Sequence, residues 1–255
     1  MHRSTRELLK YHIRASDGEI GRCKDFLFDD QAWVIRYLVA DTRKWLPGRK
    51  VLVPPQSLKK PHVENRLLPV EHTKEEIRQS PPLDADEPVS RKYEKKWFDY
   101  YRLPYYWVGP TGVGIVPNPV PLRDSPVPLE EEVTPRPLPS EKEIEKTHLR
   151  SADEVIGYQV EAIDGHIGHV EDLLVEDADW RIAYLLIDTR DWLPGKKVVM
   201  LPDLAEEISW PKETVQFDRS KEEMENAPPY NPELELTSAY EKALEQYYGI
   251  PPHNE

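Results

Sequence analysis

The sequence predicts a mainly β protein in which two small β-barrels, each followed by short helices, are joined by a proline-rich linker. The first observation is a repeat: shifting the sequence by 147 positions aligns residues 3–101 with 150–248 without a gap. The second is that short alternating runs of apolar and polar residues, separated by turn residues, recur within each copy, as is typical of strands. The third is a segment rich in proline between the copies.

The repeat sets the expected domain boundaries. We expect a first copy over 1–101, a linker over 102–146 and a second copy over 147–250. The linker holds ten prolines between Pro104 and Pro139, a composition that favours extended geometry and acts as a semi-rigid spacer. Its first part, YYRLPYYWVG, has the alternative role of a strap that packs onto a barrel.

The first strands of each copy follow from turn and alternation signals. Asp17-Gly18 is typical of a two-residue hairpin turn, and we expect both residues to take positive φ. The stretch EIGRCKDFLFDD then supplies the second strand. The next stretch, WVIRYLVADT, alternates, and the second copy keeps its Trp, Ile and Tyr positions. We therefore expect the face with Trp33, Ile35 and Tyr37 to form the core.

One motif recurs in the same order, as DTRKWLPGRK at 41–50 and DTRDWLPGKK at 188–197. Leu-Pro-Gly suits a tight type II turn, because proline presets φ and glycine accepts the positive φ that follows. We expect another strand directly after it, at 50–53 and 197–200. The exposed cations and tryptophans of the motif are candidate partner contacts: Arg43, Trp45 and Arg49 in the first copy, and Arg190, Trp192 and Lys196 in the second.

Two helices are expected to close each copy. Thr73-Lys-Glu-Glu76 and Ser220-Lys-Glu-Glu223 match the capping box, so short helices begin there and end before the Pro-Pro pairs that follow. The last helix of each copy carries one apolar stripe at helical spacing. The stripe consists of Tyr93, Trp97, Tyr100 and Tyr101, or of Tyr240, Leu244, Tyr247 and Tyr248.

Together these stretches resemble the PRC-barrel family, which is named for the cytoplasmic domain of the photosynthetic reaction-centre H subunit and also includes a domain of a ribosome-maturation factor. The resemblance covers both halves except the linker and the extreme ends. It implies small six-stranded barrels that bind partners or assist assembly, without a catalytic constellation. It rests on DGEIGRCKDFLFDD and DGHIGHVEDLLVED, on DTRKWLPGRKVLVPP and DTRDWLPGKKVVMLP, and on the tails TKEEIRQSPP…YEKKWFDYYRLPYYW and SKEEMENAPPY…YEKALEQYYGIPP.

Catalytic and metal sites are not expected. No histidine recurs at an aligned position, so triad-type nucleophilic catalysis has no duplicated support. His166 and His169 suggest a metal site with Glu171 and Asp172, but strand spacing points the two imidazoles to opposite faces. The single cysteine, Cys23, aligns with a valine, which favours a buried apolar position. We expect no cofactor.

The net charge of −13 is unevenly divided, with +4 in residues 1–101, −2 in the linker and −15 in residues 147–255. The barrels are expected to pair by charge complementarity, within a chain or in a homo-oligomer, or the basic half faces an anionic membrane surface or partner. Nucleic acid is disfavoured because the acidic half would repel a polyanion, although four cations surround Trp45. These cations are Arg43, Lys44, Arg49 and Lys50.

Location and function follow from these patterns. With one cysteine, no apolar leader and no apolar run of about 18 residues, we expect a cytoplasmic protein without a transmembrane helix. The predicted function is a non-catalytic protein-binding or assembly module rather than an enzyme. Two alternatives stay open: a membrane-peripheral accessory of a photosynthetic or electron-transfer complex, and binding related to RNA or ribosome maturation.

Overall fold

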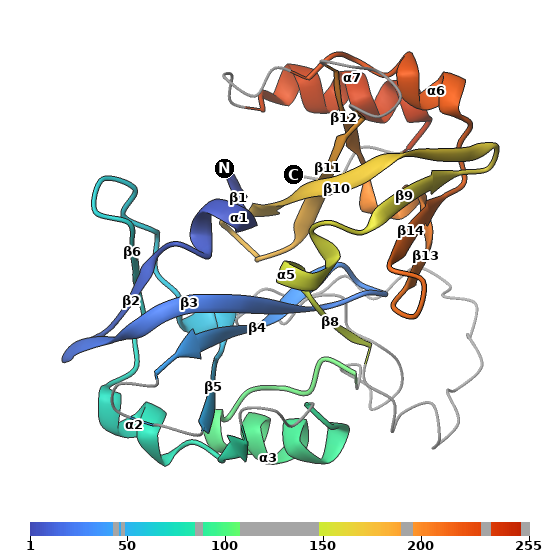
Figure 1. Ribbon diagram of the computed structural model, residues 1–255. Coiled ribbons are helices and arrows are strands. Elements are labelled where there is room, and N and C mark those ends of the chain that lie inside the picture. The colour runs from blue at the N-terminus through green and yellow to red at the C-terminus, as the bar shows by residue number, and fades with distance from the viewer. Residues whose placement is uncertain are drawn as a thin grey trace, which may run out of the picture. The chain divides into compact units, whose positions relative to one another are not determined.

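The structure is a computed structural model that describes residues 1–42, 46, 49–84, 89–107, 148–189, 196–230 and 236–250. The chain divides into two compact units. The C-terminal unit combines Met1–Lys10 with Arg150–Glu255, and the N-terminal unit is Tyr11–Leu149. Each is built around one seven-stranded sheet (Figure 1). The expectation of a mainly β protein is confirmed.

In the N-terminal unit the sheet order is β6-β2-β3-β4-β5-β7, and β8 pairs with β3 off this path. The strands of this sheet are β2 (His12–Ala15), β3 (Gly18–Asp29), β4 (Val34–Asp41), β5 (Arg49–Val53), β6 (Leu67–Pro69), β7 (Leu83–Asp84) and β8 (Leu149–Ser151), of which only Leu149 lies within the unit. Its helical elements are the 3₁₀ turn η1 (Pro55–Ser57) and the helices α2 (Lys74–Gln79) and α3 (Arg91–Tyr101).

In the C-terminal unit the sheet order is β12-β11-β10-β9-β14-β13, and β1 pairs with β10 off this path. Its strands are β1 (His2–Ser4), β9 (Gln159–Ala162), β10 (Gly165–Glu176), β11 (Ile182–Asp188), β12 (Lys197–Met200), β13 (Ala205–Ser209) and β14 (Thr214–Phe217). Its helical elements are α1 (Thr5–Leu8), α5 (Ala152–Val155), η2 (Pro202–Leu204), α6 (Lys221–Glu225) and α7 (Ser238–Tyr248).

Most elements of the two repeats correspond, but β7 and β13 have no equivalent among the strands that the structure describes. Shifted by 147 positions, β3 coincides with β10, η1 with η2 and α3 with α7, residue for residue. Both capping boxes are present, at Thr73 and Glu76 and at Ser220 and Glu223. The helices and the strands that follow the Leu-Pro-Gly motif thus lie where the sequence predicts them.

The first segment of each repeat belongs to the sheet of the other repeat. β1 pairs antiparallel with β10, with Arg3 opposite Val175, and α1 follows it along the same strand (Figure 1). The equivalent of β1 in the second repeat, β8, pairs with β3 of the first. The repeat boundaries 1–101 and 147–250 therefore differ from the unit boundaries, because the chain crosses between units after Lys10 and after Leu149.

The expected barrels are not confirmed, since neither sheet closes on itself through the strands that the structure describes. In each unit the strand after the Leu-Pro-Gly motif runs into a 3₁₀ turn that begins at proline, at Pro55 and at Pro202. Proline has no amide hydrogen and cannot extend the ladder there. The chain therefore leaves the sheet at this point instead of continuing its pairing.

The first hairpin differs from the expected turn. Ala15 pairs with Gly18, so the loop residues are Ser16 and Asp17, and among them and Gly18 only the glycine has positive φ, at 152°. The prediction that Asp17 takes positive φ is wrong. The Asp17 carboxylate instead accepts a hydrogen bond from the backbone amide of Lys74 at 2.8 Å, and this role fixes the conformation of the turn.

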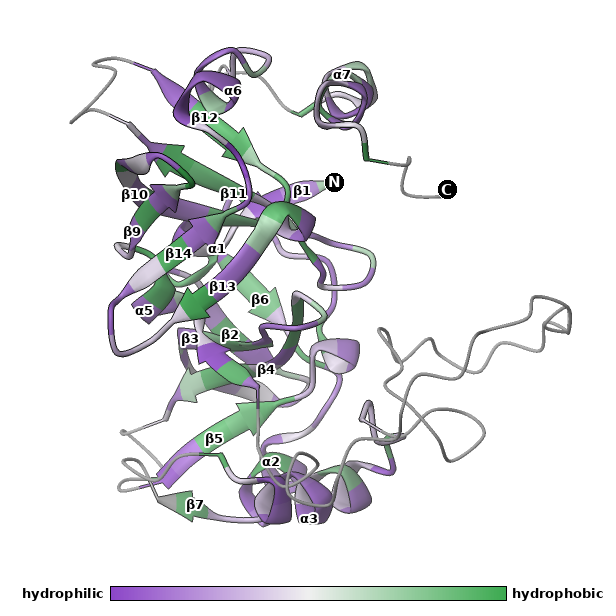
Figure 2. Ribbon diagram, turned by 90° about the vertical axis from the view of Figure 1, so that its right-hand side faces the viewer, coloured by the Kyte–Doolittle hydropathy of each residue, from purple (hydrophilic) through white to green (hydrophobic). Residues whose placement is uncertain are grey.

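Strand β4 is buried on both faces, whereas the sequence predicted one core face. The face with Tyr37 packs against α3, where the ring centroids of Tyr37 and Trp97 are 4.8 Å apart. Leu38 on the opposite face is also fully buried. Both faces of β4 are therefore covered, which agrees with the apolar residues along most of its length. Figure 2 shows the same hydrophobic character along β12 and over most of β5.

Two equivalent glycines fix the end of the repeated Asp-Thr strand. A Cβ atom on Gly21 would lie 1.9 Å from the carbonyl oxygen of Asp41, and one on Gly168 would lie 2.0 Å from that of Asp188. Both glycines have positive φ, 146° and 150°. Only glycine allows this close approach of two backbones.

We expect Gly168→Ala to lower the free energy of unfolding by at least about 3 kcal/mol, because the new methyl group collides with backbone that cannot move aside. Gly157→Ala is the control: Gly157 also has positive φ, at 112°, but nothing lies within 4 Å of its Cβ position. That change should cost about 1–2 kcal/mol from backbone strain alone. Denaturant unfolding measures both, and equal losses would contradict the collision.

Candidate partner-binding region

Two of the six candidate contact residues have a structural role in common. Arg49 donates to the carbonyl oxygens of Arg78 and Ser80 at the end of α2, and to the Ser80 hydroxyl at 2.9 Å. Its equivalent, Lys196, donates to the carbonyl oxygen of Glu225 at the end of α6. Each cation satisfies carbonyls that a helix end leaves free and complements the helix dipole.

The other four candidates, Arg43, Trp45, Arg190 and Trp192, lie outside the described residues. The structure describes the strands on either side of each Leu-Pro-Gly motif. These strands hold Arg49 and Lys196 against the helix ends. The flanks of the motif therefore have a role in the fold of both units.

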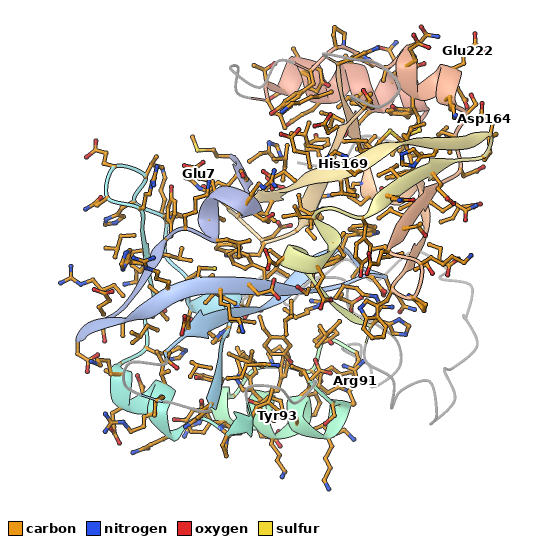
Figure 3. The ribbon with its side chains drawn as sticks, viewed as in Figure 1. Glu7, Arg91, Tyr93, Asp164, His169 and Glu222 are labelled. Atoms are coloured by element: carbon orange, nitrogen blue, oxygen red, sulfur yellow. The ribbon has the colours of Figure 1, made fainter. Side chains whose placement is uncertain are left out.

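The repeated aspartate of the first hairpin also binds a helix. Asp17 Oδ1 accepts from the amide of Lys74, and Asp164 Oδ1 accepts from the amide of Lys221, both at 2.8 Å. Figure 3 shows Asp164 at the tip of the β9–β10 hairpin, near Glu222 of α6. A carboxylate at a helix N-terminus accepts from free amides and is favoured by the dipole. This residue fixes the helix on the hairpin in both units.

The repeated tyrosines of the last helix bind backbone in the same way in both units. Tyr93 donates to the carbonyl oxygen of Pro81 at 2.9 Å, and its equivalent, Tyr240, donates to that of Pro228 at 3.1 Å. Tyr93 lies on α3, as Figure 3 shows. Two helical turns further on, a second pair of equivalent tyrosines binds the preceding helix. The Tyr100 hydroxyl donates to the Glu76 carbonyl at 2.7 Å, and the Tyr247 hydroxyl donates to the Glu223 carbonyl at 2.8 Å.

The outer face of α3 differs in charge from the equivalent face of α7. Lys92, Lys95 and Lys96 are exposed on this helix. At the equivalent positions α7 has Ala239, Lys242 and Ala243, which are also exposed. Residues three and four apart share one helix face, so the three lysines form one basic surface. We call it the α3 lysine face.

A buried polar cluster, which the sequence did not predict, lies beneath α3. Glu94 is fully buried, and its Oε1 accepts from the hydroxyls of Tyr37 and Tyr106, each at 2.8 Å. Its Oε2 accepts from Arg91 Nη1 at 2.6 Å. Arg91 is labelled in Figure 3. The second copy carries Ser238 in place of Arg91, so it cannot form this ion pair.

Burial dominates the electrostatics of this cluster. Desolvation raises the pKa of Glu94, while Arg91 and the two phenols act against that rise. Burial and the nearby Glu94 carboxylate raise the pKa of Tyr37 and of Tyr106. The groups satisfy one another and are shielded from solvent. The arrangement suits a structural network rather than proton transfer to a substrate.

The cluster also holds the start of the proline-rich segment. Tyr106 is 2% exposed, and Leu103, Tyr105 and Trp107 pack against the core around Trp97. The Arg91 guanidinium lies 4.2 Å from the Trp107 ring centroid, a cation–π contact. Residues 102–107 thus act as a strap on the N-terminal unit, and the rest of the predicted linker, 108–146, lies outside the described residues.

The histidine and acid cluster considered in the sequence analysis does not form a metal site. His166 is exposed, and His169 is half-buried. Glu171 accepts from Lys197 at 2.6 Å, and Asp172 accepts hydrogen bonds from residues 4–6. Over the ranges that the structure describes, no group of three or more His, Cys, Asp or Glu side chains could hold a metal ion.

Cys23 is 3% exposed, as expected from its valine counterpart. Burial raises the pKa of its thiol well above the usual value, so the thiolate is disfavoured at neutral pH. A nucleophilic role for this residue is not supported.

No protein-family model matches this chain, and no curated protein matches it. Among the helices in the described part of the chain, none is both long and apolar enough to cross a bilayer.

We expect Arg49→Met and Lys196→Met each to lower the free energy of unfolding by about 1–2 kcal/mol, since helix carbonyls lose a cationic donor. Lys60→Met, at an exposed position, is the control and should change it by less than about 0.5 kcal/mol. Denaturant unfolding measures all three. Unchanged stability in the first two would contradict their role at the helix ends.

Glu94→Ala leaves the Arg91 guanidinium buried without a carboxylate, and we expect it to cost about 3–5 kcal/mol. The control is the equivalent change in the second copy, Glu241→Ala, because the Glu241 side chain is 26% exposed. A part-exposed carboxylate should contribute less than about 1 kcal/mol. If calorimetry and urea unfolding gave similar losses for the two variants, the cluster would not be a stabilising network.

Proposed function

We propose that this chain is a non-catalytic protein-binding or assembly module, made of two copies of one PRC-barrel-type fold that present different surfaces. One observation carries the proposal. Repeated polar residues bind equivalent backbone atoms in both copies. Asp17 and Asp164 each accept from the first amide of a helix, and Arg49 and Lys196 each donate to a carbonyl at the end of that helix. Folding thus accounts for their recurrence, and no duplicated chemistry is needed to explain it.

The surfaces that differ are then the source of specificity. The α3 lysine face (Lys92, Lys95 and Lys96) carries three adjacent positive charges, whereas the equivalent positions of α7 carry one. Clustered exposed cations attract an oppositely charged surface and speed association, and salt screens this effect. We assign an acidic protein surface as the partner of this face. The motif residues Arg43, Trp45, Arg190 and Trp192 are further candidate contacts.

The test uses the tagged full-length chain as bait in a nuclease-treated lysate of its source cell, at low and high salt. The variant carries Lys92→Glu, Lys95→Glu and Lys96→Glu. The matched control carries Ala239→Glu, Lys242→Glu and Ala243→Glu at the equivalent exposed positions of α7. We expect an acidic protein that the unsubstituted chain and the control retain at low salt, that the variant loses, and that high salt releases.

Equal retention by all three baits would contradict the assignment to the α3 lysine face. Capture of nucleic acid alone, in a parallel pull-down from lysate without nuclease, would favour the alternative of an RNA-related function. A partner that is an integral subunit of an electron-transfer complex would favour the membrane-peripheral alternative. Circular dichroism spectra of the three proteins show whether each substituted chain is folded.

A further inference from the structure

The N-terminal arm, Met1–Lys10, completes the C-terminal unit although it belongs to the other repeat. Its strand β1 pairs with β10 over His2, Arg3 and Ser4. The side chain of Leu8 is 1% exposed. We call the residues that bind the arm the arm dock. They are those of β10, with Asp172, together with Asp177 and Glu241.

Asp172 is the polar centre of the arm dock, and it is 7% exposed. Its carboxylate accepts from the hydroxyls of Ser4 and Thr5, the latter at 3.0 Å, and from the amide of Arg6 at 3.1 Å. It also accepts from the amide of Leu173 at 2.8 Å. Three successive residues of the arm thus bind one buried carboxylate, and hydrogen bonds to a charged acceptor are stronger than those between neutral groups.

Further bonds hold the start of the arm. Arg3 forms an ion pair with Asp177, whose amide donates to the carbonyl oxygen of Met1 at 3.0 Å. His2 Nδ1 lies 3.2 Å from a carboxylate oxygen of Glu241 on α7. The arm therefore makes backbone, ionic and apolar contacts along its whole length.

The hinge that connects the arm to its own repeat is very short. Leu8 is buried in the C-terminal unit and Tyr11 in the N-terminal unit, each 1% exposed, with only two residues between them. The second repeat begins with the same pattern: Arg-Ser-x-x-Glu and two aliphatic residues occur at 3–9 and at 150–156. Each repeat thus supplies one such segment and receives one.

We propose that the arm dock also takes the arm of a second copy of this chain, so that two chains form a dimer by exchanging residues 1–10. The contacts with Asp172, Asp177 and β10 are the same whichever chain supplies the arm, and exchange of an identical element is a low-cost route to dimers. The covalent tether favours the intrachain arm, so exchange between chains requires high protein concentration. The inference does not depend on the proposed function.

The experiment mixes two full-length chains, each with one new cysteine, in a Cys23→Val background that copies the second repeat. One carries His2→Cys and the other Glu176→Cys, at positions that are direct Cα partners in the ladder. Opposite residues of an antiparallel pair have the spacing that a disulfide needs. After incubation at high concentration and mild oxidation, a non-reducing gel separates linked from unlinked chains.

We expect the mixture to give several-fold more two-chain product than a control mixture in which Glu176→Cys is replaced by Glu206→Cys, at an exposed position of β13. A single chain that carries both His2→Cys and Glu176→Cys tests whether the two positions are close enough to bond, because it should then form an intrachain disulfide. If that disulfide closes and the mixture gives no more product than the control, exchange between chains is overturned.

A second measurement avoids engineered cysteines. The unsubstituted chain is incubated at high concentration, diluted and examined at once by sedimentation velocity. Because exchange requires the arm to leave its dock, we expect a dimer that dissociates slowly after dilution. Monomer alone at every concentration would overturn the proposal, and so would a dimer that dissociates at once.

Discussion

The hydrogen bonds between the Asp172 carboxylate and residues 4–6 place the start of the first repeat in the sheet of the second. The rest of the fold depends on this exchange. The sheet around β10 contains β1 from the first repeat, and the sheet around β3 contains β8 from the second. Neither repeat by itself holds all the strands of a unit. The duplication therefore gives two sheets that each contain strands from both repeats.

This architecture separates structural from functional residues. In both units an aspartate from a hairpin binds the N-terminus of a helix, and a cation from a strand binds its C-terminus. Such paired use explains why the sequence repeats polar residues that look like a site. The first copy adds a buried Arg91–Glu94 pair with two tyrosines, which fastens the strap 102–107. The copies also differ on the surface, where α3 carries three exposed lysines and the equivalent positions of α7 carry one.

Much of the fold could be predicted because the sequence contains two copies, and a signal that occurs at the same position in both is stronger than a signal in one. Equivalent capping boxes located α2 and α6, and equivalent aromatic stripes located α3 and α7. The turn at Asp17 could not be predicted, because its carboxylate serves a helix 57 residues away. The exchange of first segments between the two repeats of the chain also could not be predicted. Residues 3–9 and 150–156 carry the same pattern, so local sequence fits either dock equally well. The burial of Glu94 could not be predicted either, because it depends on the packing of α3, β4 and the strap 102–107.

The most direct test of this account is a cross-strand nuclear Overhauser effect from Arg3 in the full-length protein. When the arm of the first repeat lies in the sheet of the second repeat, the Arg3 backbone protons lie opposite Val175 of β10. If each arm instead completed its own repeat, Arg3 would face Phe28, the residue 147 positions before Val175. The account predicts a contact between Arg3 and Val175 and none between Arg3 and Phe28. A contact with Phe28 would contradict the exchange.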